Sequence, residues 1–183
     1  MSQEQRVFYL HEDDWGMVSL VPHENLAFLH EERDRIDAFS AAHFDGVAWT
    51  DISVRSEEPS PIALRAIPYT RLTELFGSLL PAADRFETGY SSYREPCPGC
   101  FAFGKPYDFA LYGSIKDGIV TGLSLSMQLP PADTALSQAL AVALVALGAE
   151  YQLVLVDWAR SKIVNLSDPA AVARYLSDDE EDA

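Results

Sequence analysis

The chain has 183 residues, 48% of them apolar, and a formal net charge of −15 at neutral pH. The acidity is uneven: residues 1–58 carry thirteen carboxylates against four arginines, residues 178–182 add five carboxylates, and residues 59–177 balance ten acids against nine bases. An acidic surface of this size repels phosphate backbones and anionic lipid and attracts basic protein patches, which excludes nucleic acid and membranes as expected partners.

Length and apolar content predict a single globular domain over residues 1–177, large enough to bury a core, and an acidic disordered tail at residues 178–183. The N-terminus lacks the basic segment and apolar stretch of a signal peptide, and the longest apolar run, residues 139–149, is too short to span a bilayer. We therefore expect the protein in the cytoplasm.

The chain opens with two short apolar runs, residues 7–10 and 17–21, on either side of the acidic residues 12–14. This pattern predicts a hairpin with the acids on its turn. From Glu24 to about His43, apolar residues recur at helical spacing while acids take the other faces, which predicts an amphipathic surface helix.

Residues 47–55 alternate between apolar and polar side chains, which predicts a strand. Residues 70–80 have one apolar side and are followed by Pro81, so they predict a second helix that ends there. The stretch from residue 85 to residue 107 is rich in turn residues and aromatics, and we expect irregular structure in it.

Residues 108–115 and 119–129 predict a hairpin, because Asp117-Gly118 between them favours the positive φ angles of a tight turn. Polar residues alternate along the second strand, so one face of this hairpin is expected to meet water. Residues 132–148 are apolar on almost every side, which predicts a central, buried helix that stops at Gly148.

Residues 151–158 and 162–166 predict a last hairpin, and Asp168-Pro169 predicts the cap of a short terminal helix that runs to Leu176. Together these elements predict an α+β fold: a mainly antiparallel sheet of hairpins with three to four helices, one of which (132–148) is central and buried.

The segment Cys97-Pro98-Gly99-Cys100 has the spacing of a redox dithiol or of half a zinc site. The surrounding prolines and glycines, however, exclude the helix that follows a thioredoxin-type pair. The chain also has no other cysteine, and its histidines all lie far upstream. The pattern therefore favours a tight turn or a local disulfide between Cys97 and Cys100.

The four histidines all fall within the first 43 residues, close to acids. On the predicted helix, His30 and Asp34 are one turn apart and His23 lies on the same stripe, so these three side chains are candidate metal ligands. The sequence has no HExxH motif, and a polar stripe on an exposed helix is the more ordinary outcome.

Catalytic signatures are missing from the sequence. It contains no G-x-S-x-G elbow and no glycine-rich phosphate loop, so we predict no catalytic residue and no cofactor. A protein-binding function is favoured over the alternative, which is a thiol redox or metal-dependent enzyme that uses Cys97 and Cys100 or the His/Asp stripe.

The candidate contact residues combine acids with an aromatic anchor, which suits a basic protein partner. A second interpretation of the turn is that its tryptophan folds back onto the core. The predicted contact residues are Glu12, Asp13, Asp14 and Trp15 on the first turn and Glu31 and Glu32 on the predicted helix.

In general style, the segments 8–16, 153–158 and 162–166 resemble the immunity proteins that bacteria make against polymorphic or contact-delivered toxins. This resemblance implies an inhibitor that blocks the active site of a basic toxin domain, such as a nuclease, by complementary shape and charge. It carries no diagnostic motif, so no residue role is transferred from it.

Overall fold

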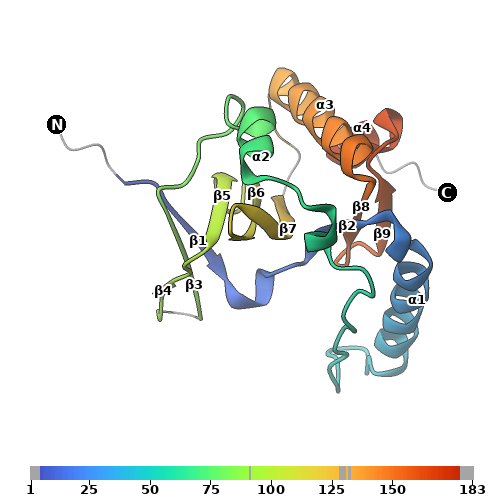
Figure 1. Ribbon diagram of the computed structural model, residues 1–183. Coiled ribbons are helices and arrows are strands. Elements are labelled where there is room, and N and C mark those ends of the chain that lie inside the picture. Colours follow the sequence, from blue (N-terminus) through green and yellow to red (C-terminus); the bar gives the residue numbers. More distant parts are fainter. Residues whose placement is uncertain (1–4, 91, 128–130, 132, 178–183) are drawn as a thin grey trace.

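The computed structural model describes residues 5–90, 92–127, 131 and 133–177, and the chain has an α+β fold, as predicted (Figure 1). The predicted tail at residues 178–183 lies outside the described residues. In chain order the elements are β1 (Val7–His11), β2 (Val18–Pro22), α1 (Leu26–Ala42), α2 (Tyr69–Phe76), β3 (Arg85–Gly89), β4 (Glu95–Pro96), β5 (Cys100–Gly104), β6 (Phe109–Lys116), β7 (Ile119–Met127), α3 (Thr134–Tyr151), β8 (Leu153–Asp157), β9 (Lys162–Asn165) and α4 (Pro169–Ser177).

The described strands form two sheets. The large sheet has six antiparallel strands in the order β5-β6-β7-β2-β8-β9, and β2 lies at its centre with Leu20 opposite Leu155 of β8. In the small sheet, of order β1-β3-β4, β1 runs parallel to β3 with Phe8 opposite Phe86, and β4 runs antiparallel to β3. Antiparallel pairing therefore dominates, as the sequence predicts.

One face of the large sheet carries the main core, which α2, α3 and α4 cover. Along each strand the side chains alternate between the two faces, so Leu20, Leu125 and Leu155 all point into this core. Figure 1 shows the three helices along the upper side of the sheet.

The predicted central helix is α3. It packs on the core face of the large sheet, but only one side of the helix is buried. Leu140, Leu144 and Leu147 are fully buried, whereas Val142 on the other side of the helix is 70% exposed. Among the described helices α3 alone is long and apolar enough to cross a membrane, by length and composition only. The prediction that Gly148 ends the helix is wrong: α3 runs on to Tyr151, and a side chain at position 148 would collide with Leu166.

The opposite face of the large sheet has two separate covers. The small sheet packs Phe8 and Phe86 against Tyr112 of β6. At the other end, α1 packs Leu29 against Val21 and Val154. The strip of β2 and β7 between these two covers holds polar side chains, and a cleft opens above it.

Several local predictions agree with the structure. The hairpin of β6 and β7 turns at Asp117 and Gly118, which both have positive φ, and β8 pairs with β9 as predicted. Asp168 caps α4 by accepting hydrogen bonds from the amides of Ala170 and Ala171. The helix predicted for residues 70–80 is present as α2 but ends at Phe76.

Three predictions that depend on distant pairing are wrong. The first two strands do not form a hairpin, because β1 pairs with β3 and β2 pairs with β7 and β8. The stretch expected to be irregular, residues 85–107, contains β3, β4 and β5. Residues 47–55 form no strand, and their apolar side chains are exposed.

The buried stripe of α3 gives a first prediction. We expect Leu144→Ala to lower the free energy of unfolding by about 2 to 5 kcal/mol, because it removes buried methyl groups and leaves a cavity. Val142→Ala is the matched control. It should change the free energy of unfolding by less than about 0.5 kcal/mol, since Val142 faces solvent. Urea unfolding of the two variants measures both values, and equal effects would contradict the burial of one stripe only.

Candidate protein-binding surface

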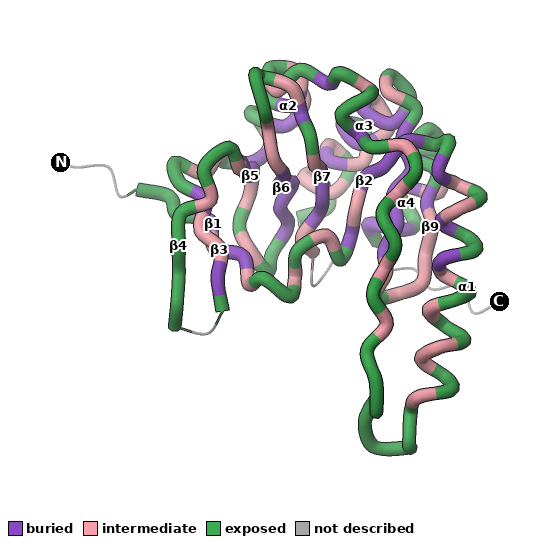
Figure 2. Tube along the Cα trace, turned by 60° about the horizontal axis from the view of Figure 1, so that its bottom comes forward, coloured by how far each residue is buried: buried purple, intermediate pink, exposed green. Residues whose placement is uncertain are grey.

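The second half of α1 extends beyond the sheet, and the chain returns beside it (Figure 2). Within α1 only Leu29 and Glu32 are buried, and both lie in its first half. Past Glu32 the helix therefore has no core to cover, which is why it projects. The returning chain comprises residues 43–60. We call residues 33–56, which comprise this part of α1 and most of the returning chain, the arm.

The tip of the arm is ordered by its own polar contacts. The Asp45 carboxylate accepts hydrogen bonds from the amides of Val47 at 2.9 Å and Ala48 at 2.8 Å, and these donors lower the pKa of Asp45. The amide of Thr50 donates to the carbonyl of His43 at 2.8 Å. The tip is thus a defined turn rather than a loose loop.

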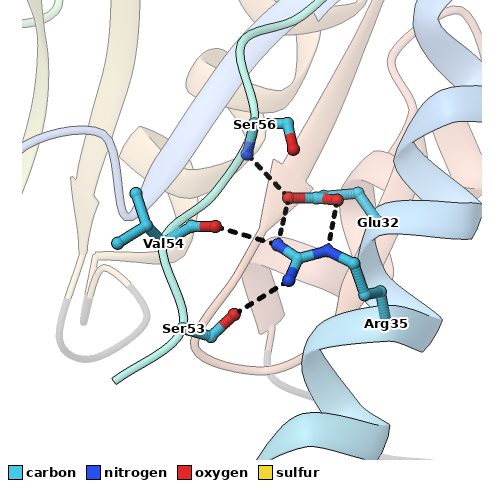
Figure 3. Close-up of polar contacts among 5 residues, drawn as sticks. All are labelled: Glu32, Arg35, Ser53, Val54 and Ser56. Atoms are coloured by element: carbon cyan, nitrogen blue, oxygen red, sulfur yellow. Dashed lines mark hydrogen bonds and ion pairs between the residues drawn. The ribbon is translucent and has the colours of Figure 1, made fainter. Parts of the chain in front are cut away.

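Along the returning chain, Glu32 of α1 fixes the backbone (Figure 3). Its carboxylate accepts two hydrogen bonds from the Arg35 guanidinium, at 2.7 and 2.8 Å, and a third from the amide of Ser56 at 2.7 Å. Arg35 in turn donates to the carbonyl of Val54 at 2.9 Å and to the hydroxyl of Ser53 at 3.2 Å. We call this network the Glu32 clamp.

Hydrogen bonds to the carboxylate dominate the electrostatics of the clamp. Glu32 is only 5% exposed, yet the hydrogen bonds from Arg35, and then the amide of Ser56, lower its pKa from 4.5 to about 2. Burial acts in the opposite direction and is outweighed. The burial does not fit the prediction that Glu32 contacts a partner, because its carboxylate holds the arm together instead. The predicted contact residue beside it, Glu31, is exposed.

A second contact fixes the base of the returning chain. The buried Asn25 donates from its side-chain amide to the carbonyl of Ser60 at 2.8 Å and accepts from the amide of Ser60 at 2.9 Å. Hydrogen bonds therefore hold the chain at residue 56 and again at residue 60.

The clamped backbone presents a set of apolar side chains to solvent. The exposed fraction is 91% for Val47, 84% for Ile52 and 80% for Val54. Single exposed apolar residues are ordinary, but a concentration of large ones marks an interaction site. We call the five large exposed apolar residues of the arm the apolar row: Phe44, Val47, Trp49, Ile52 and Val54.

The charge around the apolar row is negative. Residues 26–58 contain eight carboxylates and three arginines, and each arginine is engaged. Arg33 pairs with Asp34, Arg35 pairs with Glu32, and Arg55 bonds to the main body. The exposed acids of this region are Glu31, Asp34, Asp37, Asp45, Asp51 and Glu57.

A cleft of about 470 Å³ lies beside the base of the arm, above the uncovered strip of the large sheet. Its lining includes Ser19 of β2, Thr121 and Ser124 of β7, the two indoles of Trp15 and Trp158, and Arg55 and Glu57 of the returning chain. The expectation that one face of the β6–β7 hairpin meets water holds only in part, because Thr121 is exposed beneath this cleft whereas Ser124 is buried.

Arg55 joins the arm to the body across this cleft. It donates to the carbonyl of Gly16 at 2.9 Å, and its guanidinium lies 5.2 Å from the ring centroid of Trp158. Partial burial lowers the pKa of Arg55, and the nearby Glu58 opposes this shift. Arg55 therefore adds a third attachment of the returning chain, between its bonds at residue 54 and residue 56.

The acidic turn predicted as a contact site is a 3-10 turn, Glu12–Asp14, between β1 and β2. Glu12 and Asp13 are exposed, while Asp14 accepts a hydrogen bond from the hydroxyl of Tyr107. Trp15 is 37% exposed and packs edge-on against Phe86 and Tyr112. Trp15 thus packs against the core on one side and lines the cleft on another.

The two cysteines form a disulfide in a tight turn between β4 and β5, where the amide of Cys100 donates to the carbonyl of Cys97. Both side chains pack against the small-sheet core. Each sulfur is bonded to the other, so in this state neither provides a free thiolate for redox attack or metal binding.

The histidine stripe is not assembled into a metal site. His23 lies in a 3-10 turn, and His30 and Asp34 are exposed on α1. Over residues 5–90, 92–127, 131 and 133–177, no three His, Cys, Asp or Glu side chains come together in a way that could hold a metal ion.

Comparison with protein-family models, curated proteins and solved structures gives no match. The arm is therefore the feature of the molecule that bears on function. Sequence reasoning missed the apolar row because the alternation of residues 47–55 was assigned to a strand within the sheet. It also missed Arg35, whose spacing of three from Glu32 on a helix was the available signal.

The Glu32 clamp gives a second prediction. A carboxyl whose pKa is lowered in the folded state stabilises that state above its unfolded pKa, and this contribution is lost as the pH falls from 4.5 towards 2. We expect Glu32→Gln to lower the free energy of unfolding by about 2 to 3 kcal/mol at pH 7, with the difference from the unmodified protein shrinking below pH 4.5.

Denaturant unfolding between pH 7 and pH 3 measures this difference, and amide hydrogen exchange should show faster exchange at Ser56 in the variant. Glu31→Gln is the matched control, since it removes an exposed charge one residue away and should change stability by less than about 0.5 kcal/mol. A Glu32→Gln effect of equal size at pH 3 and pH 7 would show that packing, not the charge, is responsible.

Proposed function

We propose that this protein is a non-enzymatic binding domain that contacts a basic protein partner through its arm. The observation that carries the proposal is the apolar row: five large apolar side chains lie exposed on a backbone that hydrogen bonds hold in place. Such a surface binds tightly when a partner removes it from water, and the fixed backbone reduces the entropy lost on binding.

The magnitude of the effect supports the row as the main source of affinity. Full burial of one Val, Ile or Phe side chain contributes about 1.5 to 3 kcal/mol. Trp49 offers the largest area of the five, and tryptophan is enriched among residues that dominate binding energy. The binding free energy from two or three such contacts is enough to make the difference between a transient encounter and a specific complex.

The surrounding acids support a basic partner. Exposed carboxylates on both the helix and the returning chain create a negative field, which accelerates encounter with a positive surface and disfavours acidic competitors. The acidic turn with Glu12, Asp13 and Trp15 is a second acidic surface, and in the proposal it makes supporting contacts.

In its most concrete form, we propose an immunity-type inhibitor in the cytoplasm that blocks a basic toxin domain, such as a nuclease. This form rests on the resemblance of segments 8–16, 153–158 and 162–166 to immunity proteins and on the net charge of −15. An inhibitor of this class needs shape and charge complementarity rather than catalytic groups, which suits a surface made of apolar anchors and carboxylates.

The proposal predicts that the apolar row sets affinity. If a toxin gene lies directly upstream, the purified catalytic domain of that toxin is the partner to test. We expect the double variant Trp49→Ala, Ile52→Ala to raise the Kd at least 30-fold in calorimetry, because two anchors leave the interface. Val142→Ala, which truncates an exposed apolar residue outside the arm, should leave the Kd unchanged. A double variant that binds as tightly as the unmodified protein would remove the arm from the interface.

The acids should control the rate of association rather than the final affinity. We expect Glu31→Lys with Glu57→Lys to slow association several-fold and to flatten its dependence on salt, because both side chains are exposed and each is next in sequence to a residue of the Glu32 clamp. Glu12→Lys with Asp13→Lys should have a smaller effect in the same stopped-flow measurement. If the turn variant has the larger effect, the partner approaches the acidic turn first.

A further inference from the structure

We propose that the outer edge of residues 51–57 is an unfilled strand site, to which a basic partner adds an antiparallel β-strand. The inference rests on the proposed function, since it specifies how the arm engages its partner. It explains why residues 47–55 carry the sequence pattern of a strand although the fold gives them no neighbouring strand.

The exposure of the side chains in this segment alternates as it does along a strand. Ile52 and Val54 are exposed, while Ser53 and Arg55 between and after them are half-buried, which is the two-residue period of an extended chain. Val54 directs its carbonyl to Arg35, and Ser56 directs its amide to Glu32, so both point towards α1.

In an extended chain, the N–H and C=O of one residue point to one side and those of the next residue point to the other. The backbone groups of Ser53 and Arg55 therefore point away from α1. Within the part of the chain that the structure describes, these four groups have no hydrogen-bond partner. They form the free edge that a partner strand requires.

The space beside this edge is open. The cleft is lined by residues 54–58 on one side and by Trp15, Ser19 and β7 on the other, and no residue of α1 lines it. The cleft thus lies on the side of the returning chain that faces away from the helix. A strand added there would run along the mouth of the cleft.

The charges of residues 51–57 indicate which kind of partner strand can bind there. A second copy of this chain, paired antiparallel about Val54, would place Asp51 directly opposite Glu57 at both ends of the ladder. Like charges in directly opposed positions destabilise a sheet, whereas opposite charges stabilise it. The site therefore fits a strand with basic residues six positions apart and apolar residues facing Ile52 and Val54.

A synthetic peptide provides the probe. In the blocked heptapeptide Lys-Val-Thr-Val-Thr-Val-Lys, the lysines would lie opposite Glu57 and Asp51, the valines on the side of Ile52, and the threonines opposite Arg55 and Ser53. The matched control has the same side chains but carries N-methyl groups on the two threonine amides, so it cannot donate to the free edge.

We expect the unmodified peptide at saturation to slow hydrogen exchange of the Ser53 and Arg55 amides at least tenfold, measured by NMR on the full chain. The N-methylated peptide should bind at least tenfold more weakly. In the protein, Ser53→Pro removes an edge donor and should weaken peptide binding at least tenfold, whereas Ser53→Ala removes only the hydroxyl contact with Arg35 and should leave it within threefold. Protection of the Ser56 amide reports whether the clamp remains closed in each variant.

Two outcomes would overturn the strand site. If both peptides shift the signals of Trp49, Ile52 and Val54 equally and slow no edge amide, the arm binds through side chains alone, and the proposed function stands without the strand. If neither peptide perturbs the arm at millimolar concentration, the strand site is wrong. The toxin titration with the Trp49→Ala, Ile52→Ala variant then decides the proposed function independently.

Discussion

The arm depends on the buried carboxylate of Glu32. Taking a charge out of water is costly, and Glu32 tolerates it because Arg35 and the amide of Ser56 provide three charge-assisted hydrogen bonds. A returning chain is ordinarily held by its apolar side chains, which pack against the core. Here the polar contacts hold the chain, so Ile52 and Val54 remain outside.

The second constraint is the incomplete cover of the large sheet. The small sheet and α1 each bury one end of the same face, through Phe86 and Leu29 respectively, and between them Ser19 of β2 and Thr121 of β7 line an open cleft. Polar side chains such as Ser19 and Thr121 allow this part of the sheet to face water without an apolar penalty. Arg55 crosses the opening and so fixes the position of the arm relative to the body.

The features that could be predicted from the sequence are those that residues close together in the chain determine. The features that depend on distant residues could not be predicted. The β6–β7 turn at Asp117-Gly118 and the Asp168 cap were predictable, because residues a few positions apart determine each of them. The parallel pairing of β1 with β3 joins Phe8 to Phe86, and no local pattern specifies a partner so distant. Alternation in residues 47–55 indicated an extended chain but could not indicate whether a strand would lie beside it. The same limit applies to the candidate site: the spacing of Glu32 and Arg35 is visible in the sequence, whereas their contact with Ser56 is not.

The acidity of the chain and the exposure of the apolar row are linked physically. The proposed strand edge, which carries the exposed side chains of Ile52 and Val54, would ordinarily promote self-association. A net charge of −15 opposes the approach of a second copy, and the register that pairs Asp51 with Glu57 makes symmetrical pairing unfavourable at close range. For a basic partner, both the long-range interaction with the net charge and the close interaction with Asp51 and Glu57 would be attractive. In the proposed function, the carboxylates that keep copies of the chain apart are therefore also the groups that favour a basic partner at the apolar row, so that resistance to self-association and choice of partner would have a common electrostatic origin.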